Sequence, residues 1–536
     1  MSVEEPVREE PGPEEPVPEE RPRASGRSIR RWVARSASAN LLSRGIAVLV
    51  AFVMTPYILG HLGPSTYGLW VLAGAIVGYA GLLDLGVAGA LTKYVAEHRE
   101  RDEWSETNAL IATSLRLYAL MGIVIAGLGL VAGLILPPIF GIPPSERETA
   151  TRVIALLALG VAIAIPATTS SAILKGLGRY DLVAAIRIVG SLVGAASTIL
   201  VIELGYGVVG MAATNVPVTL LTFGLGVVCV RRVAPRLRIG VRGADRRSAG
   251  SIASFSAPLV ILEIGGRLQS ESDEIVIGAF MPLAAITPFA LAARVSSVAS
   301  LVTDQFASVL LPLASSLEAA NEHRRLQEAF LTGTRLTIAL FVPIGLGLAI
   351  LGGPFLSAWV GPAYASAAPI VVILTLSAGI DMAMWPAGFV LQGLRRHHRL
   401  GWLALGSGLA NLALSIVLIG PLGITGVAIG TLVPTTIECF LFVMPFALSV
   451  LGIGGGRAFR EVVVPTALPA IPALVVLVAL RLLLEPGTLV GIALVGLAGL
   501  AVYGGTYLLM TPARQERELL ADVWRALVGR VGRARA

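Results

Sequence analysis

The chain of 536 residues is 55% hydrophobic and only 14% charged, and its mean hydropathy is +0.80. Soluble domains carry about 25% charged residues, whereas this chain repeatedly offers apolar runs of the roughly 20 residues that a spanning helix needs. Lipid admits only helices or closed barrels, and continuous apolar runs exclude the alternating strands of a barrel. The composition therefore predicts an all-α polytopic membrane protein.

The chain begins with MSVEEPVREEPGPEEPVPEERPR, which is rich in Pro and Glu and poor in core-forming residues. Such a composition stays disordered, and an acidic start is the opposite of a signal peptide, so we expect no cleaved leader. The basic stretch GRSIRRWVARS predicts a short segment on the membrane interface. Residues 1–37 are thus expected to form an acidic tail and a basic interfacial segment.

About fourteen transmembrane spans are expected next, each a continuous apolar run between polar loops. They cover residues 38–60, 67–93, 108–136, 149–174, 182–203, 207–230, 253–280, 284–314, 331–357, 366–393, 400–420, 424–450, 462–484 and 488–510. They divide into an N-terminal six-helix lobe (38–230), a basic cytoplasmic linker (231–252), a C-terminal six-helix lobe (253–450) and two extra helices (451–510). The tail, 511–536, predicts a basic amphipathic helix on the inner surface.

Alternate loops differ in charge, and this difference predicts the orientation. The basic loops are VAEHRERDEW, KGLGRYD, RRVAPRLRIGVRGADRR, EHRR, RRHHR and GGRAFR, whereas HLGPST, MPLAA, VGPAYAS and PLGIT contain no Lys or Arg. Positively charged loops remain in the cytoplasm, so both termini are expected there, in a bacterial-type inner (plasma) membrane. These loops explain the net charge of +7, so nucleic acid is not an expected partner.

Neither the cysteines nor the histidines predict a redox or metal site. Cys229 and Cys439 lie in or at the end of apolar runs and form no spacing pattern. The histidines fall at loops or helix ends and are too scattered to indicate a metal: His61, His98, His323, His397 and His398.

An internal repeat relates the two lobes. Residues 173–217 and 390–434 align without gaps and share Gly176/Gly393, Arg179/Arg396 and Pro217/Pro434 among other matches. A weaker similarity pairs PYILGHLGP with EIVIGAFMP. Because each repeat holds an even number of spans, both lobes have the same orientation, and such parallel repeats place the substrate site at their interface.

Residues 44–97 carry the run P-x-x-x-G-x-L-G-x-x-x-Y-G-L-W, then L-D-L-G, then a basic residue before V-A-E. This pattern resembles the polysaccharide and oligosaccharide-lipid flippases of the multidrug/oligosaccharidyl-lipid/polysaccharide exporter (MOP) superfamily, and most of all the O-antigen (Wzx-like) type. The resemblance covers residues 38–450. It implies two six-helix lobes around a cavity with alternating access, and as cargo a sugar chain on an isoprenoid pyrophosphate. It also implies the lipid bilayer and polysaccharide-assembly proteins as partners.

Ionisable residues inside spans are costly in lipid and therefore default to functional candidates. An anionic cargo needs buried cations and polar groups. The candidates for a substrate cavity are Arg44, Asp84, Arg267, Arg294, Asp304 and Asp381. Each has a structural alternative, either a side chain that extends to the interface or a pair across the bundle.

Span seven contains the sequence EIGGRLQSESDEIVIGAF. On a helical wheel, Glu263, Arg267, Glu271 and Glu274 fall within one arc of about 80°, and Asp273 lies on its shoulder. This charged stripe must face protein or water. It either braces the helix through i,i+4 pairs, or it lines the cavity, where Arg267 meets the pyrophosphate and a carboxylate takes a coupling H⁺ or Na⁺. No other cofactor is expected.

Three other functions remain open from the sequence. One is a non-transporting scaffold, in which the acidic tail or the amphipathic C-terminal helix docks a partner. A cation-coupled exporter of small molecules, from the same superfamily, would favour a site with net negative charge. A membrane polysaccharide polymerase or ligase would need catalytic groups on large outer loops, and these loops are short and nearly free of His, Asp and Glu. The chain has no nucleotide-binding motif or metal-ligand spacing, so we expect a transporter and no enzyme.

Overall fold

The computed structural model describes residues 26–84, 86–307, 310–396 and 398–510. The acidic tail expected at residues 1–23 and the amphipathic helix expected at 511–536 lie outside these ranges, whereas the basic stretch expected as a short interfacial segment forms the start of the long helix Gly26–Gly78. Every regular element in the described part of the chain is a helix, which confirms the predicted fold class.

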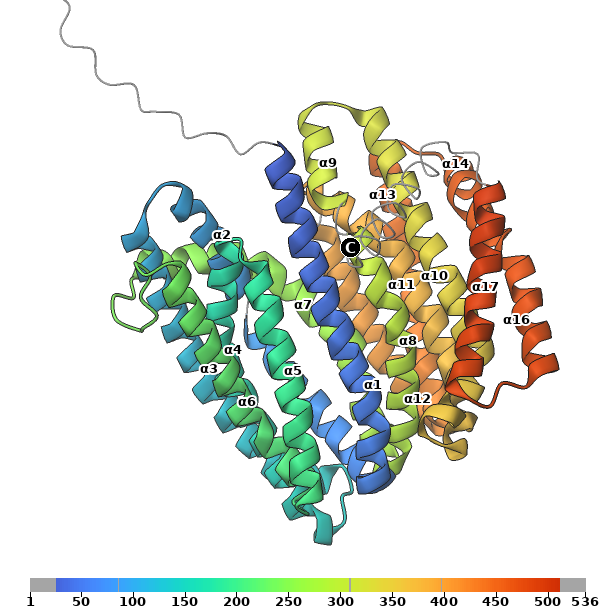
Figure 1. Cartoon of the computed structure of the whole chain (residues 1–536), viewed down its shortest axis with the longest axis horizontal. Coiled ribbons are helices and arrows are strands. Elements are labelled where there is room, and N and C mark those ends of the chain that lie inside the picture. The colour runs from blue at the N-terminus through green and yellow to red at the C-terminus, as the bar shows by residue number, and fades with distance from the viewer. Residues whose placement is uncertain (1–25, 85, 308–309, 397, 511–536) are drawn as a thin grey trace, which may run out of the picture.

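The helices form two bundles side by side, with α1 (Gly26–Gly78) and α7 (Arg246–Phe280) running between them (Figure 1). The N-terminal bundle contains α2 (Val87–Glu100), α3 (Trp104–Ile139), α4 (Pro144–Gly176), α5 (Tyr180–Glu203) and α6 (Gly207–Val233). The C-terminal bundle contains α8 (Ile286–Ala307), α9 (Leu310–Ala319), α10 (His323–Val360), α11 (Ala368–Gly393), α12 (His398–Ile437) and α13 (Met444–Leu451). Beyond these, α14 (Gly455–Ala458), α15 (Val464–Ala467), α16 (Ala470–Leu484) and α17 (Leu489–Met510) continue the chain, and α16 and α17 pack on α10 at the edge of this bundle.

Eleven helices in the described residues are long and apolar enough to span a membrane. Two of them, Leu42–Leu82 and Arg399–Leu451, each contain a bend at a glycine outside the helical region, Gly63 (φ 77°) and Gly423 (φ 58°). Each bend falls at a predicted loop, between spans one and two and between spans eleven and twelve. The count of fourteen stays a prediction.

The predicted continuous span 67–93 is wrong. The α-helix stops at Gly78, a 3₁₀ segment η1 (Tyr79–Asp84) follows, and α2 starts only at Val87. The residue before α2, Gly86, has a φ of 72°, a left-handed conformation that glycine adopts without the steric penalty of a side chain. The break places Asp84 at a helix end instead of in the middle of a span.

The start of α7 also differs from the prediction. The helix begins at Arg246, seven residues before the expected boundary, because Asp245 caps it by accepting a hydrogen bond from the backbone N–H of Ser248 at 2.6 Å. This hydrogen bond holds the pKa of the Asp245 carboxyl below its ordinary value. The basic linker is accordingly shorter than predicted, between Val233 and Arg246.

One apolar cluster joins the two bundles at the end that carries the uncharged loops. It unites Leu59, Tyr67 and Leu72 of α1 with Ile277 of α7 and Ile286 of α8. In lipid, helix association depends on close packing and interhelical hydrogen bonds rather than on water exclusion. We call this cluster the joint.

Backbones approach closely at the joint. A Cβ on Gly68 would stand 2.0 Å from the carbonyl oxygen of Leu283, so only glycine fits there. The Thr287 hydroxyl donates a hydrogen bond to the Pro64 carbonyl at 2.7 Å. The joint therefore holds the bundles together at the end opposite the basic loops.

Candidate functional site

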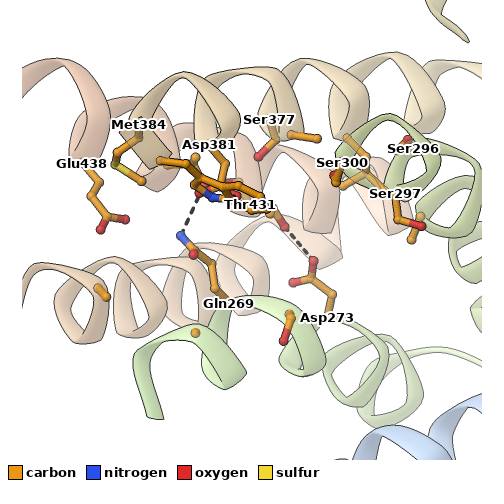
Figure 2. Close-up of a pocket in the computed structure, with 18 of the residues that line it drawn as sticks. Gln269, Asp273, Ser296, Ser297, Ser300, Ser377, Asp381, Met384, Thr431 and Glu438 are labelled. Atoms are coloured by element: carbon orange, nitrogen blue, oxygen red, sulfur yellow. Dashed lines mark hydrogen bonds between the residues drawn. The ribbon is translucent and has the colours of Figure 1, made fainter. Parts of the chain in front are cut away.

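A cavity of about 540 Å³, lined by apolar side chains and several carboxyl groups, lies in the C-terminal bundle between α7, α8, α11 and α12 (Figure 2). Four carboxyl side chains line it: two from α7, one from α11 and one from a π-helical turn, η4 (Glu438–Val443). They are Asp273, Glu274, Asp381 and Glu438. Gln269 and several serines and threonines supply other polar groups, and none of the described residues around the cavity is Lys, Arg or His.

Asp273 is held by polar side chains of α12. It is 5% exposed, and its Oδ2 accepts a hydrogen bond from the Thr431 hydroxyl at 2.6 Å, drawn as a dashed line in Figure 2. The Asn411 amide donates to the same hydroxyl oxygen at 3.0 Å. The two helices can approach this closely because Gly265 has no side chain, and a Cβ there would stand 2.6 Å from the backbone of Ala404.

Three of the four carboxyl groups keep one buried oxygen without a hydrogen-bond partner: Asp273 Oδ1, Glu274 Oε2 and Glu438 Oε2. In the fourth, Asp381 Oδ2 accepts a hydrogen bond from Trp385 Nε1 at 3.1 Å. An ionised carboxylate buried without a partner is strongly unfavourable, so a proton or a bound cation must neutralise it. The arrangement therefore suits a proton or a small cation and disfavours an anion.

The charged stripe predicted on α7 divides between two surfaces. Arg267 donates to Glu263 Oε1 at 3.2 Å and to Glu271 Oε1 at 3.3 Å. A Cβ on Gly78 would stand 3.1 Å from Glu271 Oε2, and one on Gly81 would stand 3.0 Å from Arg267 Nη2. This part of the stripe therefore faces the helix break in the N-terminal half, while the remaining two carboxylates turn into the cavity.

Asp84 lies at that helix break and belongs to a different cluster. It accepts a hydrogen bond from the hydroxyl of Tyr118, a fully buried residue of α3. Lys175, in the last turn of α4, interacts electrostatically with both Arg187 and Asp84. The break is thus tied to α3 by a buried tyrosine hydroxyl.

The other predicted substrate residues are not gathered in one place. Arg294 of α8 donates to the Thr55 hydroxyl of α1 at 2.6 Å, so it connects the C-terminal bundle to α1. Arg44 is half-buried on α1. Asp304 belongs to α8, but its side chain is outside the described part of the structure. Of the five predicted substrate residues whose side chains the structure describes, only Asp381 lines the cavity.

Sequence reasoning missed Glu438 and Lys175. Glu438 lies within the predicted twelfth span, so the rule that selected the other intramembrane charges applies to it as well. The sequence places Lys175 in a basic loop, yet the helix continues to Gly176, so Lys175 lies in the last turn of α4 and within the electrostatic influence of Asp84. The spacing of residues in the sequence does not reveal which side chains surround Glu438 or Lys175.

Comparison with known proteins places the chain in a family. A family model described as polysaccharide biosynthesis protein matches residues 61–369. The probable low-salt glycan biosynthesis flippase Agl15 of Haloferax volcanii is 20% identical over 400 residues, which are 74% of this chain and 80% of that protein.

Two solved structures are similar in fold. The lipid II flippase MurJ in an inward closed conformation has a TM-score of 0.67 at 13% identity, covering 88% of this chain and 98% of its own. A multidrug resistance MATE family transporter of the MOP superfamily, inward-facing, has a TM-score of 0.67 at 16% identity, covering 77% and 95%. Because the family model matches more than half of the chain, this protein belongs to the polysaccharide biosynthesis protein family, and its fold is similar to those of these two solved structures.

Proposed function

We propose that this protein is a flippase for an isoprenoid-pyrophosphate-linked oligosaccharide in cell-surface polysaccharide synthesis. It moves its cargo from the inner to the outer leaflet by alternating access, and a gradient of H⁺ or Na⁺ drives the movement. Family membership and the flippase named among its relatives support the transport function. The observation that carries the coupling is the cavity with three unpartnered buried carboxylate oxygens.

Helix α7 connects the cavity to the joint. It presents Asp273 and Glu274 to the cavity, and one turn later it places Val276 and Ile277 in the joint. A cation that neutralises the cavity changes the balance of charge on α7, and a ligand shifts a conformational equilibrium by its difference in affinity for the two states. Occupancy of the cavity can therefore change how tightly the bundles close at the joint.

The anionic head of the cargo calls for cations outside this cavity. Arg267 lies on the face of α7 that meets the N-terminal half, and Arg294 connects α8 to α1. Arg44 lies on α1, the helix between the bundles. These arginines fit the role of pyrophosphate contacts between the bundles. When the cargo binds, its pyrophosphate replaces one of the two carboxylates that pair with Arg267, Glu263 or Glu271.

The first test is export of polysaccharide in a strain that lacks its own flippase. Asp273→Asn keeps the shape of the side chain and removes its charge, and we expect export to fall by about tenfold or more, since contacts to a charged group contribute about 1.5–3 kcal/mol. Glu148→Gln, an exposed carboxylate at the start of α4, is the matched control. Full export by Asp273→Asn at normal expression contradicts the coupling role.

The arginines are tested in the same strain. Arg44→Ala and Arg267→Ala are expected to lower export while leaving the amount of protein in the membrane unchanged. Full export with both variants at normal expression contradicts the assignment of these cations to the cargo.

A second function, export of small organic cations, is favoured by one observation. The cavity has four carboxyl groups, and none of the described residues that line it is positively charged. An exporter of this kind raises the resistance of a susceptible strain to cationic dyes, and Asp381→Asn abolishes the effect. If the protein supports polysaccharide export but does not change the resistance of the susceptible strain to dyes, the flippase function is favoured over the exporter function.

A further inference from the structure

We propose that His98, Glu103 and Glu106 bind a divalent transition metal ion at the turn between α2 and α3. One ligand atom from each of the three residues lies within 4.8 Å of the others. His98 Nε2 and Glu106 Oε2 are already 3.7 Å apart. The turn is part of a basic loop, away from the carboxylate cavity of the other bundle, so this site lies outside the proposed transport function.

The backbone of the turn holds the three residues in place. His98 lies in the last turn of α2, Glu103 is the N-cap residue of α3, and Glu106 is in the first turn of α3. The backbone N–H of Glu103 donates to the carbonyl of His98 at 2.9 Å, and Asp102 between them adopts a positive φ of 56°. The Glu103 side chain makes no capping hydrogen bond, so its carboxylate is available to a ligand.

Nearby positive charges are directed elsewhere. Arg99 donates to the carbonyl of Leu177 at 2.8 Å, and Arg101 pairs with Glu97 at 2.9 Å. The carboxylates of Glu103 and Glu106, whose ligand atoms lie within 4.8 Å of each other, repel each other. An opposite charge close to both would stabilise their ionised forms. A bound cation would supply that charge.

The histidine side chain is largely shielded from solvent, as befits a fixed ligand. It is only 15% exposed, and its Nδ1 atom is buried without a hydrogen-bond partner. A buried polar atom without a partner is unfavourable. Nε2 is the ring nitrogen near Glu106, so it is the atom that would bind the metal, and coordination there would orient the ring and place its proton on Nδ1.

The ligand set indicates which metals fit. Imidazole nitrogen suits Zn²⁺, Cu²⁺, Fe²⁺ and Ni²⁺, whereas Mg²⁺ and Ca²⁺ prefer sites built entirely from oxygen. Zn²⁺ binds imidazole nitrogen and carboxylate oxygen at about 2.0–2.2 Å and accepts three protein ligands with a water in the fourth position. Binding would require the Glu103 and Glu106 side chains to rotate until their oxygens reach such distances from the ion. The bound ion would clamp the end of α2 to the start of α3.

Sequence spacing predicted no metal here, since the ligands come from two helices and the turn between them. The site is tested on the purified full chain in detergent, with any affinity tag removed, by equilibrium dialysis against Zn²⁺ and elemental analysis of the bound metal. We expect one Zn²⁺ per chain. His98→Gln, and the double variant Glu103→Gln/Glu106→Gln, should each weaken binding by at least about tenfold, as loss of metal-site groups does.

Glu100→Gln is the matched control, because Glu100 is an exposed carboxylate of the same turn and not one of the three ligands. It should bind Zn²⁺ as the unmodified chain does. Co²⁺ gives a second readout, the visible d–d absorption of a site with protein ligands, which His98→Gln should lose. Gel filtration checks that each variant is folded.

The proposal is overturned if the folded, unmodified chain binds no Zn²⁺, or if His98→Gln binds it equally well. It is also overturned if Mg²⁺ at equal concentration displaces the bound Zn²⁺, since an all-oxygen site would then explain the binding.

Discussion

Closure of the joint depends on the absence of a side chain at Gly68. In Gly68→Ala, the new Cβ would meet the Leu283 carbonyl oxygen, and the backbones must move apart by about 1.4 Å, from 2.0 Å to an ordinary contact of 3.4 Å. Overpacking of this kind costs about 1–3 kcal/mol. An energy of that size lowers the population of the closed joint by about 5- to 150-fold.

The distance between the bundles reports this change. Spin labels at Tyr206→Cys and Leu422→Cys occupy exposed positions at the joint end of the N- and C-terminal bundles, after Cys229 and Cys439 are replaced. Pulsed electron paramagnetic resonance should give a longer distance for Gly68→Ala in detergent and in lipid. The reason is that the variant favours the state in which the joint is open.

Gly74→Ala is the control, because a Cβ on this glycine of the same helix has nothing within 4 Å. It should leave the distance distribution unchanged. An unchanged distribution in Gly68→Ala, in a folded protein that still exports polysaccharide normally, would refute the reasoning that the joint requires this glycine.

Three further predictions follow from single contacts. Thr431→Val removes the hydroxyl that donates to Asp273, and the Na⁺ or H⁺ concentration needed for half-maximal export should change by roughly tenfold, since hydrogen bonds to charged groups contribute about 1.5–3 kcal/mol; an unchanged dependence would exclude Thr431 from the coupling site. Tyr118→Phe leaves the Asp84 carboxylate without its donor. The free energy of unfolding should fall by about 1–3 kcal/mol, so the variant should melt at a lower temperature in detergent. Equal melting temperatures would show that the helix break does not need this hydrogen bond. Asp245→Ala removes the cap of α7 and should cost about 1 kcal/mol. Because the folded-state pKa of Asp245 is lowered, its stabilisation is present above the unfolded pKa of about 3.9 and is lost as the pH falls through the folded value, so the variant and the unmodified chain should melt alike in acid; a difference that persists there contradicts the capping role.

The sequence predicted helix positions well where the bilayer requires a continuous apolar span. The spans predicted at 182–203, 366–393 and 488–510 correspond to α5 (Tyr180–Glu203), α11 (Ala368–Gly393) and α17 (Leu489–Met510). A spanning helix must be apolar along its whole length, so its ends are marked by polar residues. The break at 79–86 could not be predicted in this way, because it depends on one glycine among many that adopts a positive φ.

The candidate site shows the same limit. The helical wheel correctly gave α7 a charged side, but a wheel treats that side as one surface. In the structure, Arg267 and Glu271 meet the N-terminal half, whereas Asp273, on the shoulder of the predicted stripe, is the most deeply buried of its charges. Its partner Thr431 is distant in sequence. Only the packing of α12 on α7 brings them together.

The central claim is that this chain moves a lipid-linked oligosaccharide across a bilayer, driven by cations that bind in the carboxylate cavity. It is tested most directly with the purified protein in vesicles that contain a fluorescent isoprenyl-pyrophosphate oligosaccharide, with a lectin outside to detect the sugar. An imposed H⁺ or Na⁺ gradient should accelerate the appearance of the sugar in the outer leaflet with the unmodified chain and with Glu148→Gln, and should have no effect with Asp273→Asn. Equal rates in protein-free vesicles, or in vesicles with Asp273→Asn, would contradict the account.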